Sequence, residues 1–390
     1  MENNTENNTE NNQNNKPQIP VPECGYHLNS IYFYLTEGCN LRCRHCWINP
    51  PFEKHEKKQY PFLDLEVFKD VVRQGKALGL RAVKLTGGEP FIHPRIGEII
   101  DHVNSQNLRL NIETNGVLLT KELVSKVREN KRSFVSVSVD GENAETHEWV
   151  RRVPGCFDGA LNGIKLLKDA GFRPQLIMSI MNHNVEQMEA VVRLAEEKGC
   201  GSVKFNLVTS TGRGDMMHKT GQVLSIQKLI QIGDWVERKL APASKIPVIY
   251  SHPEAFRPLG KVVRRNTGRC GIFSIIGVLG TGKYALCGIG ETVPDLVFGH
   301  TEKDSLADIW NHNAILNEIR KGLPKKLKGV CADCISRESC KGACVANNYK
   351  RYGDLFAPHE YCEAAHQAGL FPESRLIPEN YRKAQGVPFL

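Results

Sequence analysis

Three cysteines near the start of the chain have the spacing of a metal site. Cys39, Cys43 and Cys46 form a C-x3-C-x2-C group directly after a short apolar stretch. Thiolates are the natural ligands of iron–sulfur clusters. Three of them leave one iron of a four-iron cluster open to a substrate or cofactor, as in catalytic zinc sites. The group therefore predicts a catalytic cluster, with a zinc site that includes His45, or a set of buried thiols, as the alternatives.

Seven more cysteines lie in the last third of the chain: Cys270, Cys287, Cys331, Cys334, Cys340, Cys344 and Cys362. Such a density outside a small secreted domain favours metal binding or catalysis over disulfides. A zinc ribbon would need four or eight ligands, which this spacing fits only in part. Cys24, Cys156 and Cys200 stand alone, and we expect them to be structural thiols; Cys156 is the one worth testing for function.

Short polar motifs follow the apolar segments downstream of the first cysteine group. They are Gly87-Gly88-Glu89-Pro90, Thr114-Asn115-Gly116, Ser138-Val139-Asp140-Gly141 and the run from His147 to Arg151. The glycines let backbone approach a ligand closely, and Glu89 can accept from an ammonium group. The guanidinium fork of Arg151 matches a carboxylate, although a surface ion pair would explain this residue equally well.

Strand-like and helix-like segments alternate through this region and place the motifs. Apolar segments predict strands at residues 31–36, 82–86, 108–114, 133–139, 175–181 and 202–208. Amphipathic stretches predict helices at 64–80, 121–130, 158–170 and 185–198, the first with Asp64 as N-cap. Repeated β/α units indicate a parallel sheet, whose ligands bind at the carboxyl ends of the strands. We therefore predict an α/β fold with a partial (β/α)6 barrel of TIM type.

The regular pattern ends near residue 235. We expect a disordered polar tail over 1–22, the barrel over 23–235, a Pro-rich linker over 236–262, a loop-rich cysteine domain over 263–370 and a tail over 371–390. One helix is expected at about 305–321. The cysteine-rich part has few apolar runs from which to build a core, so metal clusters would have to stabilise it.

The composition argues against several classes of protein. The formal net charge is +8, which favours an acidic partner, but no RNP-type motif or long basic block indicates nucleic-acid binding. The chain has no run of about 18 apolar residues, so no membrane span is predicted. The Asn-rich start has neither the basic nor the apolar region of a signal peptide, so a cytoplasmic location is expected.

The first cysteine group and the Gly-Gly-Glu-Pro motif resemble the radical S-adenosylmethionine (SAM) superfamily. The resemblance implies that Cys39, Cys43 and Cys46 hold a [4Fe-4S] cluster whose open iron binds SAM, and that SAM is cleaved to a 5′-deoxyadenosyl radical. It implies these further contacts to the cofactor: His45 at adenine, Gly87, Gly88 and Glu89 at the methionine amino group, Asn115 at the end of the third strand, Ser138 at the ribose and Arg151 at the carboxylate.

The second cysteine group resembles the SPASM domain, which carries auxiliary clusters behind many such barrels. The resemblance implies two further [4Fe-4S] clusters, three in all. Cys331, Cys334, Cys340 and Cys362 would ligate one completely, and Cys270, Cys287 and Cys344 would hold the other. Some relatives have a further cysteine where this chain has Arg264. We therefore hypothesise that a substrate thiol or another group completes the second site.

SPASM relatives mostly act on peptides, so the resemblance favours a maturase that forms a C–S or C–C crosslink in a ribosomally made peptide. Gly288 stands where sulfatase-maturing relatives have an Asp that serves as the base. Its absence here counts against that activity. Expected partners are a peptide with a leader segment, a separate leader-binding protein and an electron donor such as flavodoxin or ferredoxin. The alternatives are a maturase of a small-molecule cofactor or tetrapyrrole, and a zinc-binding or electron-transfer protein without radical chemistry.

Overall fold

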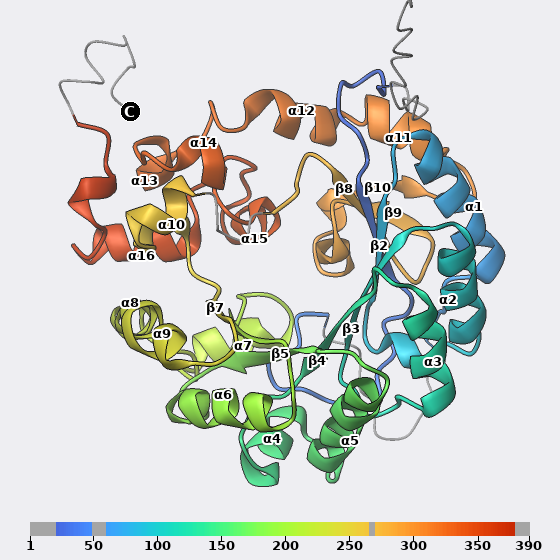
Figure 1. The fold of residues 1–390 in the computed structure, drawn as a ribbon. Coiled ribbons are helices and arrows are strands. Elements are labelled where there is room, and N and C mark those ends of the chain that lie inside the picture. Colours follow the sequence, from blue (N-terminus) through green and yellow to red (C-terminus); the bar gives the residue numbers. More distant parts are fainter. Residues whose placement is uncertain (1–20, 49–59, 265–269, 379–390) are drawn as a thin grey trace, which may run out of the picture.

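A computed structural model describes residues 21–48, 60–264 and 270–378 (Figure 1). One ten-stranded sheet runs through it in the order β10-β9-β8-β1-β2-β3-β4-β5-β6-β7. The strands are β1 Ser30–Tyr34, β2 Ala82–Thr86, β3 Arg109–Thr114, β4 Phe134–Ser138, β5 Gln175–Ile180, β6 Ser202–Leu207, β7 Val248–Tyr250, β8 Ile275–Val278, β9 Lys283–Ala285 and β10 Val297–His300. The predicted tails lie largely outside the described residues, and the domain limits stay a prediction.

Strands β1 to β7 are parallel and form an open, partial barrel, which confirms the predicted fold class. Helices cover its outer face: α1 Leu65–Ala77, α2 Ile96–Ser105, α3 Lys121–Glu129, α4 Ala144–Arg151, α5 Cys156–Asp169 and α6 Met188–Glu197. The outward side chains of the strands, such as Ile31 and Val83, are completely buried. Asp64 caps α1 as expected, because its side chain accepts from the N–H groups of Glu66 and Val67.

The inward faces of the same strands are polar. Side chains alternate along a strand, so Tyr32, Lys84, Glu113, Ser138 and Lys204 lie on the side opposite the helix-covered core. TIM barrels fill this space with layers of branched apolar residues. Here the Glu113 side chain is 41% exposed. The interior is therefore hydrophilic and open to a polar ligand.

Residues 236–262, expected to be a linker, contain regular structure. Helix α8 Ile226–Trp235 continues through a π-helical turn, Val236–Leu240, into α9 Ala241–Ala243, and β7 then pairs with β6. The Glu237 carboxylate forms ion pairs with Arg257 and Lys261 and a hydrogen bond with His252, which hold the segment in place. Closely spaced prolines hide this short strand from sequence patterns, because proline is rare inside strands.

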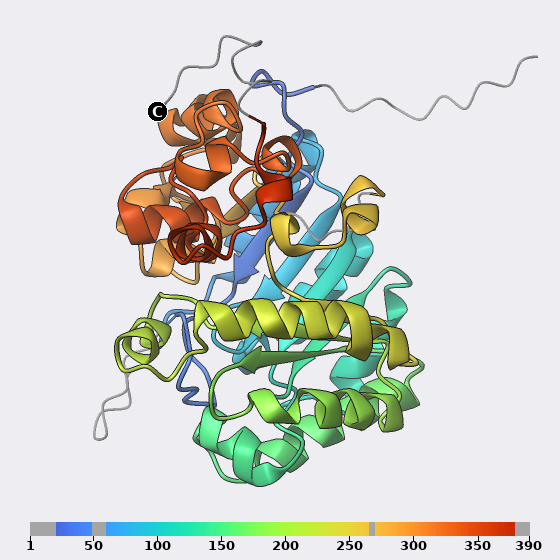
Figure 2. The same cartoon turned by 90° about the vertical axis from the view of Figure 1, so that its left-hand side faces the viewer.

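The cysteine-rich region is joined to the barrel by the sheet itself. Strand β8 pairs parallel with β1, and β9 and β10 extend the sheet antiparallel (Figure 1). The C-terminal region, orange and red in Figure 2, therefore lies beside the blue strand of the barrel. The remaining helices are α7 Arg213–Lys219, α10 Leu259–Val263, α11 Leu306–His312, α12 Ala314–Gly322, α13 Gly329–Ala332, α14 Arg337–Cys340, α15 Val345–Tyr352 and α16 Glu360–Gln367. The single helix expected at 305–321 is two helices, because Asn313 ends α11 and caps α12.

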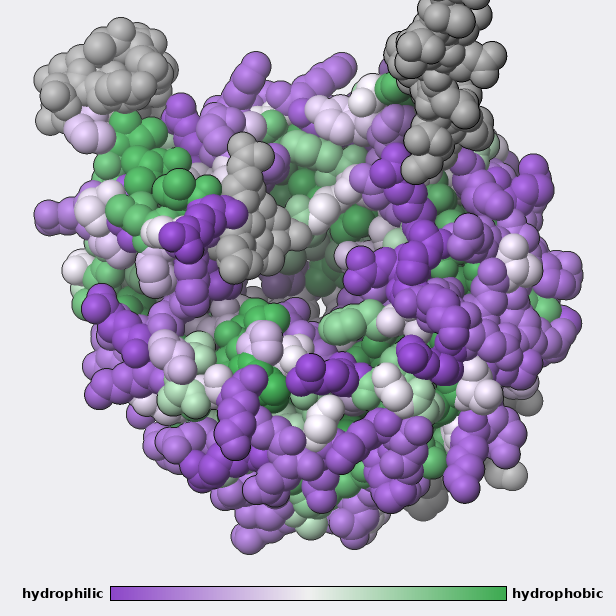
Figure 3. Space-filling view, viewed as in Figure 1, coloured by the Kyte–Doolittle hydropathy of each residue, from purple (hydrophilic) through white to green (hydrophobic). Residues whose placement is uncertain are grey.

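The molecular surface is consistent with the composition. The face shown in Figure 3 is largely hydrophilic and is hollowed near its middle, between the barrel and the cysteine-rich region. None of the described helices is both long and apolar enough to cross a membrane.

Candidate active site

A cavity of about 200 Å³ lies at the carboxyl ends of the barrel strands. It brings together every residue that the sequence predicted for the catalytic cluster and the cofactor: Cys39, Cys43, His45, Cys46, Gly87, Gly88, Glu89, Asn115, Ser138 and Arg151. These residues come from the loop after β1 and from the ends of β2, β3 and β4 and helix α4. The fold therefore collects in one place motifs that are spread over more than a hundred positions of the sequence.

The three thiols of the first group form one wall of this cavity. Burial raises the pKa of Cys39 and of Cys43; Cys43 adds to the effect at Cys39, whereas the Arg151 guanidinium opposes it at Cys43. Such thiols become thiolates only beside strong positive charge, which iron supplies because coordination deprotonates a thiol outright. Among the described residues no three His, Cys, Asp or Glu side chains can hold a single metal ion. Three thiols that line one cavity are a donor set that suits an iron–sulfur cluster with one open iron.

The cofactor contact of Gly87 and Gly88 stays a prediction, but both glycines also have a packing role. A Cβ atom on Gly88 would lie 2.0 Å from the carbonyl oxygen of Gly38, and one on Gly87 would lie 2.5 Å from that of Thr36. The N–H groups of Gly88 and Glu89 donate to Thr36 and Gly38 at 2.8 and 2.9 Å. The glycines thus allow the loop after β2 to lie against the cysteine loop, and so fix its backbone.

Glu89 is a fixed, buried carboxylate in the wall of the cavity. It is 1% exposed and accepts hydrogen bonds from the Thr114 hydroxyl (2.7 Å) and from the N–H groups of Asn115 (2.8 Å) and Phe91 (3.2 Å). Burial nevertheless raises the pKa of Glu89 to about 7. A cationic ligand would offset that cost, so the site suits an ammonium group.

Asp140, which the sequence analysis did not assign to the site, organises the opposite wall. Its fully buried carboxylate lies 2.6 Å from Arg151 Nε and 3.1 Å from His45 Nε2, and it accepts from the Ser179 N–H at 2.8 Å. Burial opposes its charge, but Arg151 and His45 hold the pKa of Asp140 well below its ordinary range. The only signal in the sequence was its place at the end of the fourth strand, two residues after Ser138.

Arg151 is tied to the cysteine loop. Its Nη1 donates to Cys43 Sγ at 3.5 Å, and its backbone carbonyl accepts from Arg42 at 3.1 Å. It is a buried ion-pair partner of Asp140 rather than a surface one, and it still lines the cavity.

Arg213, at the start of α7, is a second cation in the wall and was not found from the sequence. Its N–H donates to Cys46 O at 2.9 Å. Its Nε is buried without a hydrogen-bond partner within the described part of the chain.

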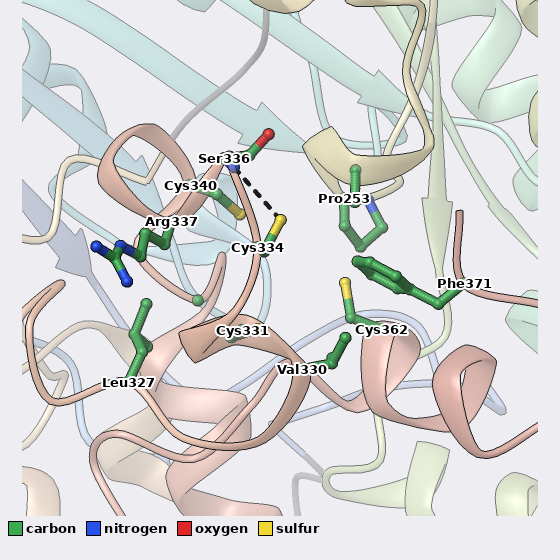
Figure 4. A pocket seen from close by; sticks show the side chains of 12 residues that line it. Pro253, Leu327, Val330, Cys331, Cys334, Ser336, Arg337, Cys340, Cys362 and Phe371 are labelled. Atoms are coloured by element: carbon green, nitrogen blue, oxygen red, sulfur yellow. Dashed lines mark hydrogen bonds between the residues drawn. The ribbon is translucent and has the colours of Figure 1, made fainter. Parts of the chain in front are cut away.

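The four cysteines predicted to ligate one auxiliary cluster line a second, closed cavity of about 10 Å³. In Figure 4 the sulfur atoms of Cys334 and Cys340 point toward each other, and Cys362 approaches from α16. Backbone N–H groups of Ser336 and His359 donate to Cys334 Sγ and Cys331 Sγ at 3.4 and 3.3 Å. Such N–H···S bonds are typical of iron–sulfur ligands, and a complete set of four thiols fits a fully ligated cluster.

Cys270, Cys287 and Cys344 form a third thiol group beside the barrel interior. Burial raises the pKa of Cys287 to about 12, and the neighbouring Cys344 and Cys270 add to the effect. A Cβ on Gly288 would lie 2.2 Å from the Tyr34 ring and 2.4 Å from the ring of Trp47. Trp47 lines the first cavity and packs edge-on against Tyr34. One aromatic layer therefore separates this group from the cavity.

Comparison with known proteins agrees with this arrangement of thiols. Residues 33–198 match the radical SAM superfamily, and residues 270–335 match an iron–sulfur cluster-binding domain, SPASM. The chain is 30% identical over 350 residues to the AdoMet-dependent heme synthase of Methanosarcina barkeri, covering 85% of this chain and 95% of that protein. The chain belongs to the radical SAM superfamily. It is an enzyme of that superfamily, and it uses SAM, a [4Fe-4S] cluster and auxiliary iron–sulfur binding.

Another relative of this radical SAM enzyme and two solved structures have names that differ from heme synthase. Mycofactocin maturase MftC of Mycolicibacterium smegmatis is 25% identical over 355 residues, covering 88% of this chain and 85% of that protein. The crystal structure of Streptococcus suis SuiB bound to SAM has a TM-score of 0.66 at 17% identity, covering 87% of this chain and 77% of SuiB. The structure of anSMEcpe with bound AdoMet and a peptide has a TM-score of 0.65 at 17% identity, covering 87% and 94%. At these identities the two structures confirm the fold alone.

Proposed function

We propose that this radical SAM enzyme forms a C–S or C–C crosslink in a ribosomally made peptide. The observation that carries the proposal is the thiol group Cys270, Cys287 and Cys344, which has three ligands and lies one aromatic layer from the SAM cavity. A site with one ligand missing can bind a substrate group, as an open catalytic metal does. A cluster at this site would hold one of the two peptide groups to be joined close to the carbon that loses its hydrogen. The relative named mycofactocin maturase supports a peptide substrate.

The residues around the first cavity divide the work of holding the cofactor. We assign the catalytic cluster to Cys39, Cys43 and Cys46, and the methionine ammonium to Glu89 with Gly87 and Gly88 behind it. His45, Asn115, Ser138 and Arg151 are assigned to the remaining parts of SAM. Once bound, SAM supplies a 5′-deoxyadenosyl radical on reductive cleavage. Asp140 keeps Arg151 and His45 in place, so that the cofactor meets preformed groups.

The two auxiliary thiol groups would bring the number of clusters to three. Cys331, Cys334, Cys340 and Cys362 hold a closed one, and Cys270, Cys287 and Cys344 an open one. An electron donor such as flavodoxin or ferredoxin supplies the reducing electron, and a separate protein binds the leader segment of the peptide.

The test uses the anaerobically purified, reconstituted enzyme with SAM, a reductant and the peptide encoded beside the gene. A crosslink removes two hydrogens from the peptide, one to 5′-deoxyadenosine and one as a proton, with one electron leaving to an acceptor. We expect mass spectrometry to show this loss, and Cys344→Ala to abolish it while Cys200→Ala, at a lone buried thiol, leaves it intact. Crosslinking by Cys344→Ala at the normal rate would contradict the role of the open site.

A second candidate function is the oxidation of tetrapyrrole side chains. The 30% identity to a protein named heme synthase, nearly along its whole length, favours it. Absorbance and mass spectrometry with Fe-coproporphyrin III as the added compound would test it. Conversion of this compound, with no change in any encoded peptide, would replace the peptide proposal.

A further inference from the structure

Lys204 is a cation inside the barrel that has no ion-pair partner in the described part of the chain. It lies on the inward face of β6, two residues before Asn206, which lines the SAM cavity. Its neighbours in register are Ile177 on β5 and Ile249 on β7, so neither adjacent strand offers an acid. Within the described part of the chain its ammonium group forms no hydrogen bond or ion pair. Burial accordingly lowers the pKa of Lys204.

Lys84, the other lysine of the interior, shows the contrast. Its Nζ lies 2.6 Å from Glu113 Oε1 and 4.9 Å from the centre of the Tyr32 ring. Burial disfavours its charge, yet the Glu113 carboxylate raises the pKa of Lys84. Glu113 also acts on Lys204, but from across the barrel and while already paired. Among the described residues, Glu113 thus acts on both lysines but is paired with Lys84.

An unpaired cation in a partly desolvated position costs free energy, and buried charges are normally paired. The auxiliary thiols do not explain Lys204, because Cys287 interacts electrostatically with Lys84 and not with Lys204. Ile177, the neighbour of Lys204 on β5, lines the SAM cavity, so Lys204 lies beside the space that the substrate shares with the cofactor. We propose that Lys204 binds a carboxylate of the substrate and so selects a substrate that carries one near the carbon to be attacked.

This inference rests on the proposed function only in taking the barrel interior as the substrate site. In a peptide the carboxylate would be an Asp or Glu side chain or the chain terminus. In a tetrapyrrole it would be a propionate. Both offer the same chemistry to an ammonium group, and the experiment distinguishes them.

The experiment measures binding to the holoenzyme in two arms. One arm uses the peptide encoded beside the gene, with each Asp and Glu changed in turn to Asn or Gln and with an amidated C-terminus. The other uses Fe-coproporphyrin III and its methyl ester. Lys204→Gln should weaken binding of the carboxylate form about tenfold to a hundredfold, because a hydrogen bond to a charged group is lost. Lys204→Arg, which keeps the charge, should restore most of it.

The neutral probes complete the test. They should bind weakly and equally to the normal enzyme and to Lys204→Gln, and Lys121→Gln, the same change at an exposed lysine of α3, should alter nothing. Equal weakening of charged and neutral probes, or none of either, would overturn the proposal. A rise in the KM for SAM in Lys204→Gln, with no change in the binding of the probes, would also overturn it. Binding of the porphyrin but of no peptide would contradict the peptide function and leave the role of Lys204 standing.

Discussion

The SAM cavity and the closed pocket of Cys331, Cys334, Cys340 and Cys362 use the same ligand chemistry in opposite ways. The first has three thiols, a volume of about 200 Å³ and a wall of charged side chains. The second has four thiols, a volume of about 10 Å³ and a largely apolar lining (Figure 4). The open site has room for a ligand and groups to orient it. The closed one has neither, which indicates a structural or electron-transfer role.

The largest expected difference between these sites comes from removing one thiol at each. Cys39→Ala should reduce 5′-deoxyadenosine formation to background and leave the melting temperature nearly unchanged. Cys362→Ala should lower the melting temperature by several degrees, because a cluster there links α13, α14 and α16, while cofactor cleavage continues. Product analysis and calorimetry on the iron-loaded proteins check both. Equal effects of the two changes on both quantities would break the comparison.

The next largest effect is expected at Asp140, which gives the open site its rigidity. Asp140→Asn leaves the buried Arg151 guanidinium without its counter-charge, which should cost about 3–5 kcal/mol of the free energy of unfolding. Urea denaturation measures this cost. Asp70→Asn, at an exposed ion pair with Arg73, is the matched control and should cost no more than about 1 kcal/mol. Similar costs for both would mean that Asp140 does not support the site.

A smaller effect should follow from disturbing the contact between the two loops of the open site. In Gly88→Ala the new methyl group would lie 2.0 Å from Gly38 O, so the cysteine loop must move. We expect a loss of about 1–3 kcal/mol and a lower iron content. In Gly260→Ala nothing lies within 4 Å of the new atom, so that variant should behave like the parent. Normal iron binding by Gly88→Ala would argue against the role given to this contact.

The last prediction is a pH dependence that Glu89 gives to the open site. The pKa of Glu89 lies at about 7, above its ordinary value of 4.5. Affinity for SAM should therefore rise with pH up to about 7, as the carboxylate forms, and then level off. The same raised pKa makes the SAM-free protein lose stability as pH rises from about 4.5 to about 7, because the folded state binds the proton more tightly. Glu89→Gln should remove the rise in SAM affinity and reduce the loss of stability, as calorimetry would measure; the remaining loss comes from Glu291, because burial raises its pKa to about 8.

The sequence predicted the barrel well because its strands repeat one simple pattern. Apolar outward residues such as Ile31 and Val83 alternate with polar inward ones, and Asp64 marks the start of the first helix. It could not predict β7, which is only three residues long and lies between prolines. The break at Asn313 was missed because the apolar pattern continues across it, and only the side-chain cap separates the two helices.

Spacing also predicted which residues share the open cavity, but not how they act on one another. Arg151 was expected to face the cofactor, and nothing in the spacing showed that Asp140 holds it. Gly88 was expected to approach a ligand, and nothing in the spacing showed that it also packs against Gly38, fifty positions earlier. Such partners are set by the packing of loops in three dimensions, and no local pattern records them.

The pairing of β8 with β1 has a consequence for how the chain folds. Strand β1, close to the start, obtains one of its two hydrogen-bonded neighbours from residues 275–278. During synthesis, the N–H and C=O groups along one edge of β1 therefore stay without hydrogen-bond partners until β8 has been made. Contacts at such long sequence separation slow folding, and a bare strand edge recruits other chains. A protein cut after residue 264 should therefore aggregate, although it would keep the three catalytic cysteines.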